Sequence, residues 1–177
     1  PTRSAARTRR RRPGWAAIRQ RAGAKVGVVR DLDVLQQFHG PFADGRFLAP
    51  HAGAAQALAQ VEPGAEVTVF LGTWCGDSRR EVPRLWSAID AAGGMVPFKV
   101  TYIGVDREKK DPAGQAAKSD IRYVPTFIVV RDGREVGRIV ESSPHGVEAD
   151  LLALLTGKAQ GVISTREDLG AGASPHP

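Results

Sequence analysis

Cysteine and metal-binding patterns are almost absent from this chain of 177 residues. Cys75 is the only cysteine, so an internal disulfide is excluded. The four histidines, His39, His51, His145 and His176, match no metal-ligand spacing, and none of them lies near Cys75 in the sequence. We therefore expect neither a metal site nor a Cys-His protease dyad.

Long apolar runs and glycine-rich phosphate-binding loops are missing too. No apolar run approaches the roughly 20 residues of a membrane-spanning helix. No segment of about 7 to 15 apolar residues follows the N-terminal arginines, as a secretory signal would require. Without a phosphate-binding motif, a nucleotide cofactor has no support. The sequence thus predicts no membrane contact, no cofactor and a cytoplasmic location.

Acidic residues are absent from the first 30 positions, which hold ten basic residues. The net charge of +6 therefore belongs to the N-terminus, because the other residues carry 15 basic and 19 acidic groups. Residues 1–27 are too polar to form a core, and we expect a disordered basic arm. Its arginine cluster, at positions 7 and 9 to 12, is not interleaved with aromatic residues. Nucleic acid is therefore not an expected partner.

Cys75 lies between a strand pattern and a helix pattern. Val67–Leu71 is a continuous apolar run, typical of a strand buried on both faces. After Cys75, apolar residues recur with helical spacing until Gly93-Gly94, at Val82, Leu85, Trp86 and Ile89. A thiol at a helix N-terminus faces unpaired backbone N–H groups and the positive end of the helix dipole, and both favour the thiolate. The pattern predicts a reactive cysteine.

The rest of the chain shows alternating helix and strand patterns. Asp132-Gly133 is a strong two-residue hairpin signal, so the strands on either side of it should pair in antiparallel fashion. Pro83 should kink its helix without ending it. The charged loop 106–111 is interpreted as solvated, with compensating charges. We expect strands over 98–105, 126–130 and 135–140, and helices over 32–38, 52–61, 115–121 and 147–155.

This order of elements resembles the thioredoxin fold. The resemblance spans about residues 67–155 and rests on Trp74-Cys75-Gly76 at the turn, Ser78, Pro83, Val124-Pro125-Thr126 and the hairpin. It implies an α/β fold with a central mixed sheet flanked by helices. Four regions would follow from it: the arm at 1–27, a helical N-terminal extension packed on the domain at 28–66, the thioredoxin-like domain at 67–157 and a loose C-terminal tail at 158–177.

The resemblance also implies a substrate wall beside the cysteine. Pro125 would be the cis-proline that packs next to Cys75, and the backbone before it would pair with an extended substrate segment. Val124, Pro125 and Thr126 would form this wall. Trp74 and Gly76 would shape the turn, and Trp74 either shields the sulfur or packs in the core.

One departure from the family pattern concerns the second cysteine, because Ser78 stands in its place. The dithiol cycle therefore cannot close within this chain, and an external thiol would have to release a mixed disulfide. The Ser78 hydroxyl could stabilise the Cys75 thiolate by a hydrogen bond. Asp77 would disfavour the thiolate, whereas Arg79, Arg80 and the helix dipole would offset it, so the net sign stays open.

These observations predict a monothiol thiol–disulfide oxidoreductase with Cys75 as nucleophile. Its partners would be protein thiols or disulfides, or glutathione mixed disulfides. Two alternatives remain open. One is a redox-inactive binding module that uses the groove beside Pro125 to hold a partner. The other is a monothiol glutaredoxin, in which the cysteine and glutathione hold an iron–sulfur cluster, although Trp74 before the cysteine resembles thioredoxin instead.

Overall fold

The computed structural model describes residues 27–29 and 50–169, which form one six-stranded sheet with helices on both faces. The strands are β1 (Gly27–Val29), β2 (Ala65–Leu71), β3 (Lys99–Gly104), β4 (Thr126–Arg131), β5 (Arg134–Val140) and β6 (Gly161–Ile163). The helices are α2 (Ala52–Leu58), α3 (Gly76–Ala91), α4 (Gln115–Lys118), α5 (Val147–Leu155) and the short 3-10 helix η2 (Glu167–Leu169).

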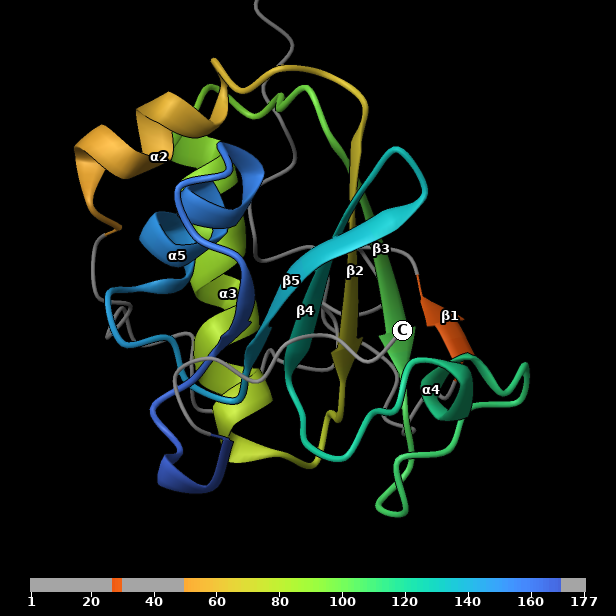
Figure 1. Ribbon diagram of the computed structural model, residues 1–177. Helices are drawn as coiled ribbons and strands as arrows, with labels where there is room; N and C mark the ends of the chain where they lie inside the picture. The colour runs from red at the N-terminus through yellow and green to blue at the C-terminus, as the bar shows by residue number, and fades with distance from the viewer. Residues whose placement is uncertain (1–26, 30–49, 170–177) are drawn as a thin grey trace, which may run out of the picture.

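The sheet is mixed, with strand order β1-β3-β2-β4-β5-β6. Strand β2 lies at its centre, parallel to β3 and antiparallel to β4. At the edges, β1 pairs antiparallel with β3, and β6 pairs parallel with β5. Figure 1 shows that β2 ends, and β4 begins, at the same lower end of the sheet.

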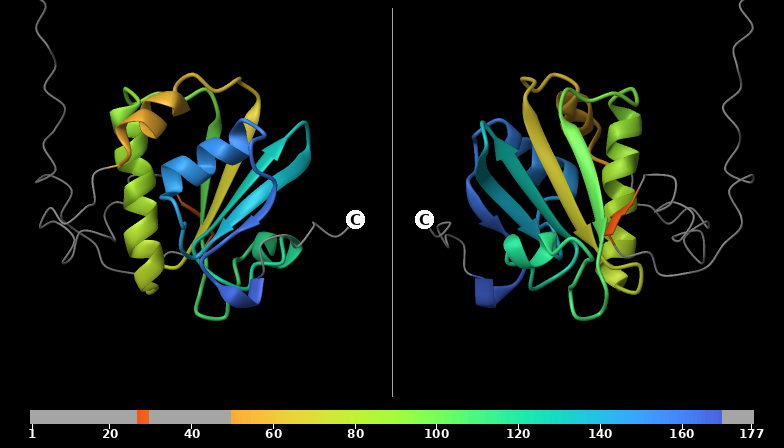
Figure 2. Two further views of the ribbon diagram at one scale, coloured as in Figure 1. Left: turned by 60° about the vertical axis from the view of Figure 1, so that its left-hand side comes forward. Right: turned by 90° about the vertical axis from the view of Figure 1, so that its right-hand side faces the viewer.

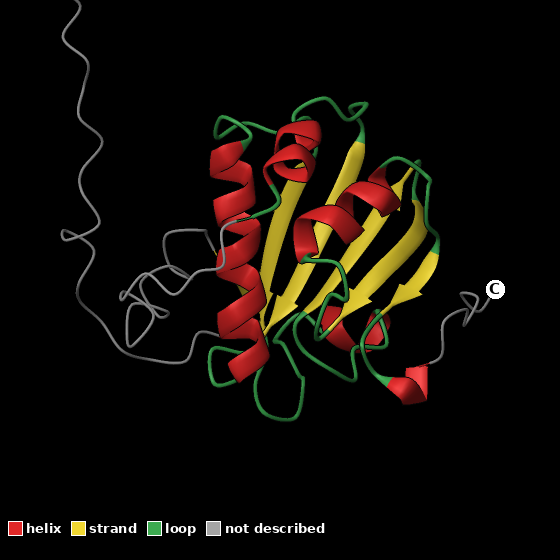
Figure 3. Cartoon of the chain, turned by 90° about the vertical axis from the view of Figure 1, so that its left-hand side faces the viewer, coloured by secondary structure: helices red, strands yellow, loops and turns green. Residues whose placement is uncertain are grey.

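Helices α2, α3 and α5 contact one another and cover one face of the sheet, whereas α4 lies on the other face (Figures 1 and 3). Both faces of the sheet need a covering helix, because the apolar side chains of strand β2 point alternately to one face and the other. Val67, Val69 and Leu71 belong to the core under α3 and α5, while Phe70 belongs to a second core with Ala116 of α4. Both cores meet at the central strand, whose carboxyl end leads into Cys75.

Most of the expected elements are present, and the predicted fold class is confirmed. Asp132-Gly133 joins β4 and β5 as an antiparallel hairpin. Helix α3 runs through Pro83 without interruption. Helix α4 has only four residues, so it is shorter than the stretch 115–121 that the pattern predicted. No helix within residues 27–29 and 50–169 is both long and apolar enough to cross a bilayer.

Two edge strands were not predicted. Strand β1 covers residues 27–29, at the junction of the expected disordered arm and the helical extension. Strand β6 corrects the prediction of a loose tail from 158, because Val162 pairs with Arg138 in register and Ser164 Oγ donates a hydrogen bond to Val140 O at 2.8 Å. The predicted helix at 32–38 and almost all of the arm lie outside the described residues.

Candidate functional site

Cys75 is the N-cap residue of α3 and directly follows the turn after β2. Its backbone is extended, with φ −89° and ψ 129°, and its N–H donates to Gly72 O at 2.9 Å. Its carbonyl accepts the Arg79 N–H at 3.1 Å, which starts the helical hydrogen bonding. The side chain is partly exposed. The structure thus places the thiol at a helix N-terminus, where unpaired N–H groups and the helix dipole favour an anion.

The segment before β4 lies against the sulfur. Cys75 Sγ donates a hydrogen bond to Val124 O over 3.1 Å, and the Val124–Pro125 peptide bond is cis. Thr126 takes a different role, because its hydroxyl donates to Tyr123 O at 2.8 Å. The structure therefore brings Val124 and Pro125 to Cys75, whereas the Thr126 hydroxyl serves the turn itself.

Ser78 does not form the predicted hydrogen bond to the thiol. Its side chain is fully buried, and its Oγ accepts the Gly72 N–H at 3.2 Å. Within the described part of the chain, Cys75 Sγ pairs with Val124 O instead. Gly72 lies in the turn between β2 and Cys75, so the Ser78 hydroxyl ties the first turn of α3 to the end of the strand. Its position supports the turn that carries the cysteine.

The charge of Asp77 is balanced by Arg80 in the same turn. Asp77 Oδ1 lies 2.8 Å from Arg80 Nη2, and the Arg80 Nε lies 2.8 Å from Glu81 Oε1. Arg80 also donates to Ser142 Oγ at 2.6 Å, which links α3 to the segment after β5. Since this ion pair is exposed, its energy is small, but it reduces the repulsion that Asp77 would exert on a thiolate.

Trp74 is held in place by the backbone around it. Its Nε1 donates to Val105 O over 3.2 Å, and the ring packs against the second core. A Cβ on Gly72 would lie 2.6 Å from Trp74 Cε2, so the ring occupies space that only glycine leaves. The Trp74 ring therefore packs in the core, and shielding of the sulfur by this ring stays a prediction.

Two basic side chains of the loop after β3 lie over the Trp74 ring. The Arg107 guanidinium carbon is 5.4 Å from the ring centroid, and Lys109 Nζ is 5.9 Å from it. Both distances are within the range of cation–π attraction. The sequence pattern indicated a solvated loop here and no connection between this loop and the site.

A C-terminal segment contacts Tyr123, the residue before the wall. The Arg166 guanidinium lies 4.0 Å from the centre of the Tyr123 ring, and its Nη1 is 2.9 Å from Glu141 Oε2. Hydrogen bonds from Arg166 hold the pKa of the Asp168 carboxyl below its usual range. Arg166 lies 43 positions from Tyr123 and 25 from Glu141, and no local sequence pattern indicates contacts over such separations.

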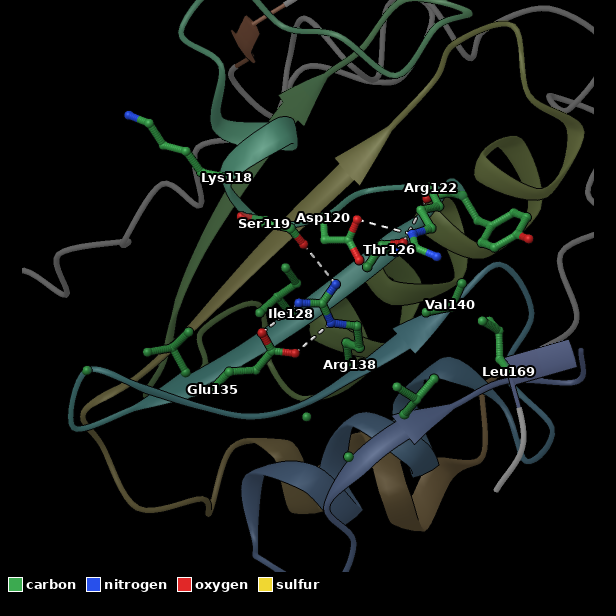
Figure 4. Close-up of a pocket in the computed structure, with 16 residues that line it drawn as sticks. Lys118, Ser119, Asp120, Arg122, Thr126, Ile128, Glu135, Arg138, Val140 and Leu169 are labelled. Atoms are coloured by element: carbon green, nitrogen blue, oxygen red, sulfur yellow. Dashed lines mark hydrogen bonds and ion pairs between the residues drawn. The ribbon is translucent and has the colours of Figure 1, made fainter. Parts of the chain in front are cut away.

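A hollow lies on the sheet face that α4 covers only in part (Figure 4). It measures about 710 Å³, and polar side chains line it together with apolar ones such as Ile128, Val140 and Leu169. Arg138 Nε lies 2.6 Å from Glu135 Oε1, and Arg138 Nη1 donates to Ser119 O at 2.9 Å. The hollow borders the turn at Thr126, but it does not contain Cys75.

The carboxyl end of the central strand thus carries one thiol at a helix start, facing a cis-proline segment. Figure 2 shows from two further sides how the helices pack around this sheet. Within the described ranges, no three histidine, cysteine or carboxylate side chains converge on a metal-binding position. This architecture and this site define an α/β protein of the thioredoxin fold.

Comparison with known proteins agrees with that class. The sequence model of the family described as thioredoxin matches residues 52–153, more than half of the chain. The chain therefore belongs to the thioredoxin family. Because the match begins at residue 52, it includes α2, which the sequence analysis assigned to an N-terminal extension.

Curated relatives support the family assignment. A thioredoxin of Staphylococcus aureus is 31% identical over 94 residues, which cover 52% of this chain and 84% of that protein. A thioredoxin of Staphylococcus epidermidis is 27% identical over 93 residues, with the same coverage. Among solved structures, Trxlp from Edwardsiella tarda is 20% identical, with a TM-score of 0.42 and coverage of 60% of this chain and 96% of that one.

Proposed function

We propose that this protein is a monothiol thiol–disulfide oxidoreductase that acts on protein or glutathione mixed disulfides. The observation that carries the proposal is the contact of Cys75 Sγ with Val124 O at 3.1 Å, at the N-terminus of α3, in a chain with no second cysteine. Membership of the thioredoxin family supports thiol–disulfide chemistry at this position. Ser78 in place of a second thiol supports the single-thiol form.

The first step is exchange between Cys75 and a substrate disulfide. The Cys75 thiolate attacks one sulfur of the substrate, a Cys75–substrate disulfide forms, and the other sulfur leaves as a thiolate. The helix N-terminus stabilises the attacking anion. The Cys75 side chain is partly exposed, so a substrate sulfur can approach it from solvent. Val124, Pro125 and Thr126 supply the backbone wall along which the substrate lies.

The second step needs an external thiol. Its thiolate attacks the Cys75–substrate disulfide at the substrate sulfur or at Cys75, and attack at the substrate sulfur frees Cys75 directly. Attack at Cys75 releases the substrate thiolate and requires a further exchange to free the cysteine. We infer that glutathione or a protein thiol has this role, and that the protein works in the cytoplasm, where such thiols are reduced.

The test uses 2,2′-dithiodipyridine, a neutral disulfide whose leaving group absorbs light. We expect one thiopyridone per chain at pH 7, released faster than from N-acetylcysteine, because the helix N-terminus favours the thiolate. Added glutathione should then release the second thiopyridone and regenerate Cys75. The matched control is the unfolded protein, which has the same thiol but no helix and should react at the rate of the free amino acid.

The rival function is a binding module in which Cys75 takes no part in exchange. One observation favours it: the Cys75 side chain is only partly exposed and packs against the second core. Such a module would react with 2,2′-dithiodipyridine no faster in the folded state than in the unfolded state. It would also fail to turn over a glutathione mixed disulfide with added glutathione. This pair of results would overturn the proposed oxidoreductase.

A further inference from the structure

The loop after β3 forms a turn that is held by hydrogen bonds to Asp106. Asp106 Oδ1 accepts the N–H groups of Glu108 and Lys110 at 2.9 and 2.8 Å, and Lys109 N–H donates to Asp106 O at 3.0 Å. Lys109 has a φ of 61°, in the left-handed region that lysine rarely adopts. The turn thus fixes where its side chains project, and it directs Arg107 and Lys109 to the same ring, Trp74.

The acidic groups of this loop are already engaged. Glu108 pairs with Lys110 at 2.6 Å, and Asp106 accepts backbone N–H groups. The Asp111 carboxylate accepts the N–H groups of Ala113 and Ala116. The charges of the loop sum to zero, since residues 106–111 include three acidic and three basic side chains. Within the described part of the chain, Arg107 and Lys109 nevertheless form no ion pair, so their positive groups are available to a ligand.

Trp74 links these two charges to the reactive turn. The indole packs against Gly72, where a Cβ would lie 2.6 Å from Trp74 Cε2, and its Nε1 donates to Val105 O. The two cations lie 5.4 and 5.9 Å from the ring centroid, each within the range of cation–π attraction. Because Trp74 directly precedes Cys75, the ring that attracts both cations belongs to the same turn as the thiol.

We propose that Arg107 and Lys109 form a carboxylate-binding subsite of the reactive turn, which selects disulfide substrates with a carboxylate beside the reacting sulfur. This inference rests on the proposed function, since it names the substrate class of the same site. Arg107 can hold a carboxylate through two parallel N–H donors, and Lys109 adds a point charge. The carboxylate comes either from an acidic side chain of a protein substrate or from glutathione.

The experiment compares peptide mixed disulfides that differ at one position. Three peptides carry Glu, Gln or Lys next to a cysteine blocked as a thiopyridyl disulfide, and kcat/KM with glutathione as reductant is measured at low salt. For the parent protein we expect the Glu peptide to exceed the Gln peptide by about fivefold, and the Lys peptide to be poorest. This preference should shrink at 0.5 M salt because screening weakens exposed charges.

Charge-removal variants identify the residues responsible. In R107Q/K109Q the ratio of Glu to Gln peptide should fall to about one. The matched control K118Q/K158Q likewise removes two positive charges, those of two exposed lysines away from the turn, and it should keep the fivefold ratio. A ratio near one in the parent, or an unchanged ratio in R107Q/K109Q, overturns the subsite.

Two further measurements separate the subsite from the proposed function. If 2,2′-dithiodipyridine reacts rapidly with Cys75 but the parent shows no peptide preference, the subsite is wrong and the oxidoreductase stands. In the C75S variant, the indole N–H resonance of Trp74 reports binding without chemistry. A shift with the free Glu peptide, absent in R107Q/K109Q/C75S, supports the subsite even if exchange fails. Glutathione disulfide and its carboxyl esters then distinguish the two sources, since only glutathione recognition is lost on esterification.

Discussion

Cys75 Sγ and Val124 O, from residues 49 positions apart, are joined by a hydrogen bond of 3.1 Å. In this arrangement the thiol proton points at a carbonyl oxygen. When the thiol ionises, the hydrogen-bond donor is lost, and the negatively charged sulfur repels the Val124 carbonyl oxygen. We therefore expect the Cys75 side chain to rotate away from Val124, toward solvent and substrate.

The first prediction concerns restoring a second thiol with Ser78→Cys. Positions 75 and 78 are one helical turn apart at the start of α3, a separation that a disulfide can bridge. In S78C the mixed disulfide formed with 2,2′-dithiodipyridine should be resolved internally, so two thiopyridones are released per chain without added glutathione. The parent should release one. Mass spectrometry then checks for loss of two hydrogens in the variant.

A control keeps the interpretation of S78C clear. In S78A the second thiol is absent, so one thiopyridone is expected, as in the parent. S78A also leaves the buried Gly72 N–H without its acceptor, which should lower the free energy of unfolding by about 1 to 3 kcal/mol. Release of two thiopyridones by S78A, or only one by S78C with a free second thiol, would contradict the proposed geometry.

The second prediction concerns the space under Trp74. In Gly72→Ala the new Cβ would lie 2.6 Å from Trp74 Cε2, so the ring must move and lose its bond to Val105 O. We expect a loss of about 1 to 3 kcal/mol in the free energy of unfolding and a shifted indole N–H resonance. Gly53→Ala in α2 is the control, because its Cβ meets no atom within 4 Å and should stabilise the helix by up to about 1 kcal/mol.

The third prediction is a dependence of stability on acid. Burial works to raise the pKa of the Asp111 carboxyl, but hydrogen bonds from backbone N–H groups at Ala116, Gln115 and Ala113 outweigh burial and hold the pKa below its usual range. A depressed pKa in the folded state means that the stabilisation is complete above the unfolded pKa of about 3.9 and is lost as pH falls through the folded pKa.

Urea unfolding of Asp111→Asn, measured from pH 7 to pH 2, tests whether the Asp111 carboxylate stabilises the fold at neutral pH and loses this effect in acid. The variant should be less stable than the parent at pH 7, and the difference should narrow as pH falls below about 4. Asp132→Asn is the control, because Asp132 is exposed in the hairpin turn and asparagine tolerates its φ of 53°. A difference between D111N and the parent that stays constant down to pH 2 would count against the carboxylate's role.

The local patterns predicted the central elements because each carries its own signal. The continuous apolar run before Cys75, the helical spacing after it and the Asp132-Gly133 turn are properties of short stretches of sequence. Strands β1 and β6 have three residues each, and their stability depends on pairing with β3 and β5. No pattern within three residues can show that pairing, so both edges of the sheet were missed.

The candidate site was likewise predictable only where a local sequence pattern determines it. Cys75 at its helix start was predictable from the strand and helix on either side, but the partner of Ser78 was not. A serine hydroxyl accepts as readily as it donates, and the buried Gly72 N–H determines which option is used. The composition of the loop 106–111 indicated that its charges compensate one another, but it could not show which side chains pair. The turn at Asp106 pairs Lys110 with Glu108 and leaves Arg107 and Lys109 without an ion pair among the described residues.

The last prediction concerns the buried ion pair between α3 and α5. Glu148 is fully buried, its Oε2 lies 3.2 Å from Arg84 Nε, and its Oε1 accepts the His51 N–H at 2.9 Å. Arg84→Met would leave the carboxylate buried with only the backbone donor. Such a loss costs about 3 to 5 kcal/mol, and this should appear as a lower free energy of unfolding in urea.

Removing the other partner should cost less. Glu148→Gln keeps an acceptor for His51 N–H and leaves Arg84 with its charge, and the partly exposed Arg84 side chain can reach water. The double variant R84M/E148Q should therefore be more stable than R84M alone, because it removes the uncompensated charge. Additive losses in the two single variants and the double variant would mean that the two side chains act independently, contrary to the 3.2 Å contact between them.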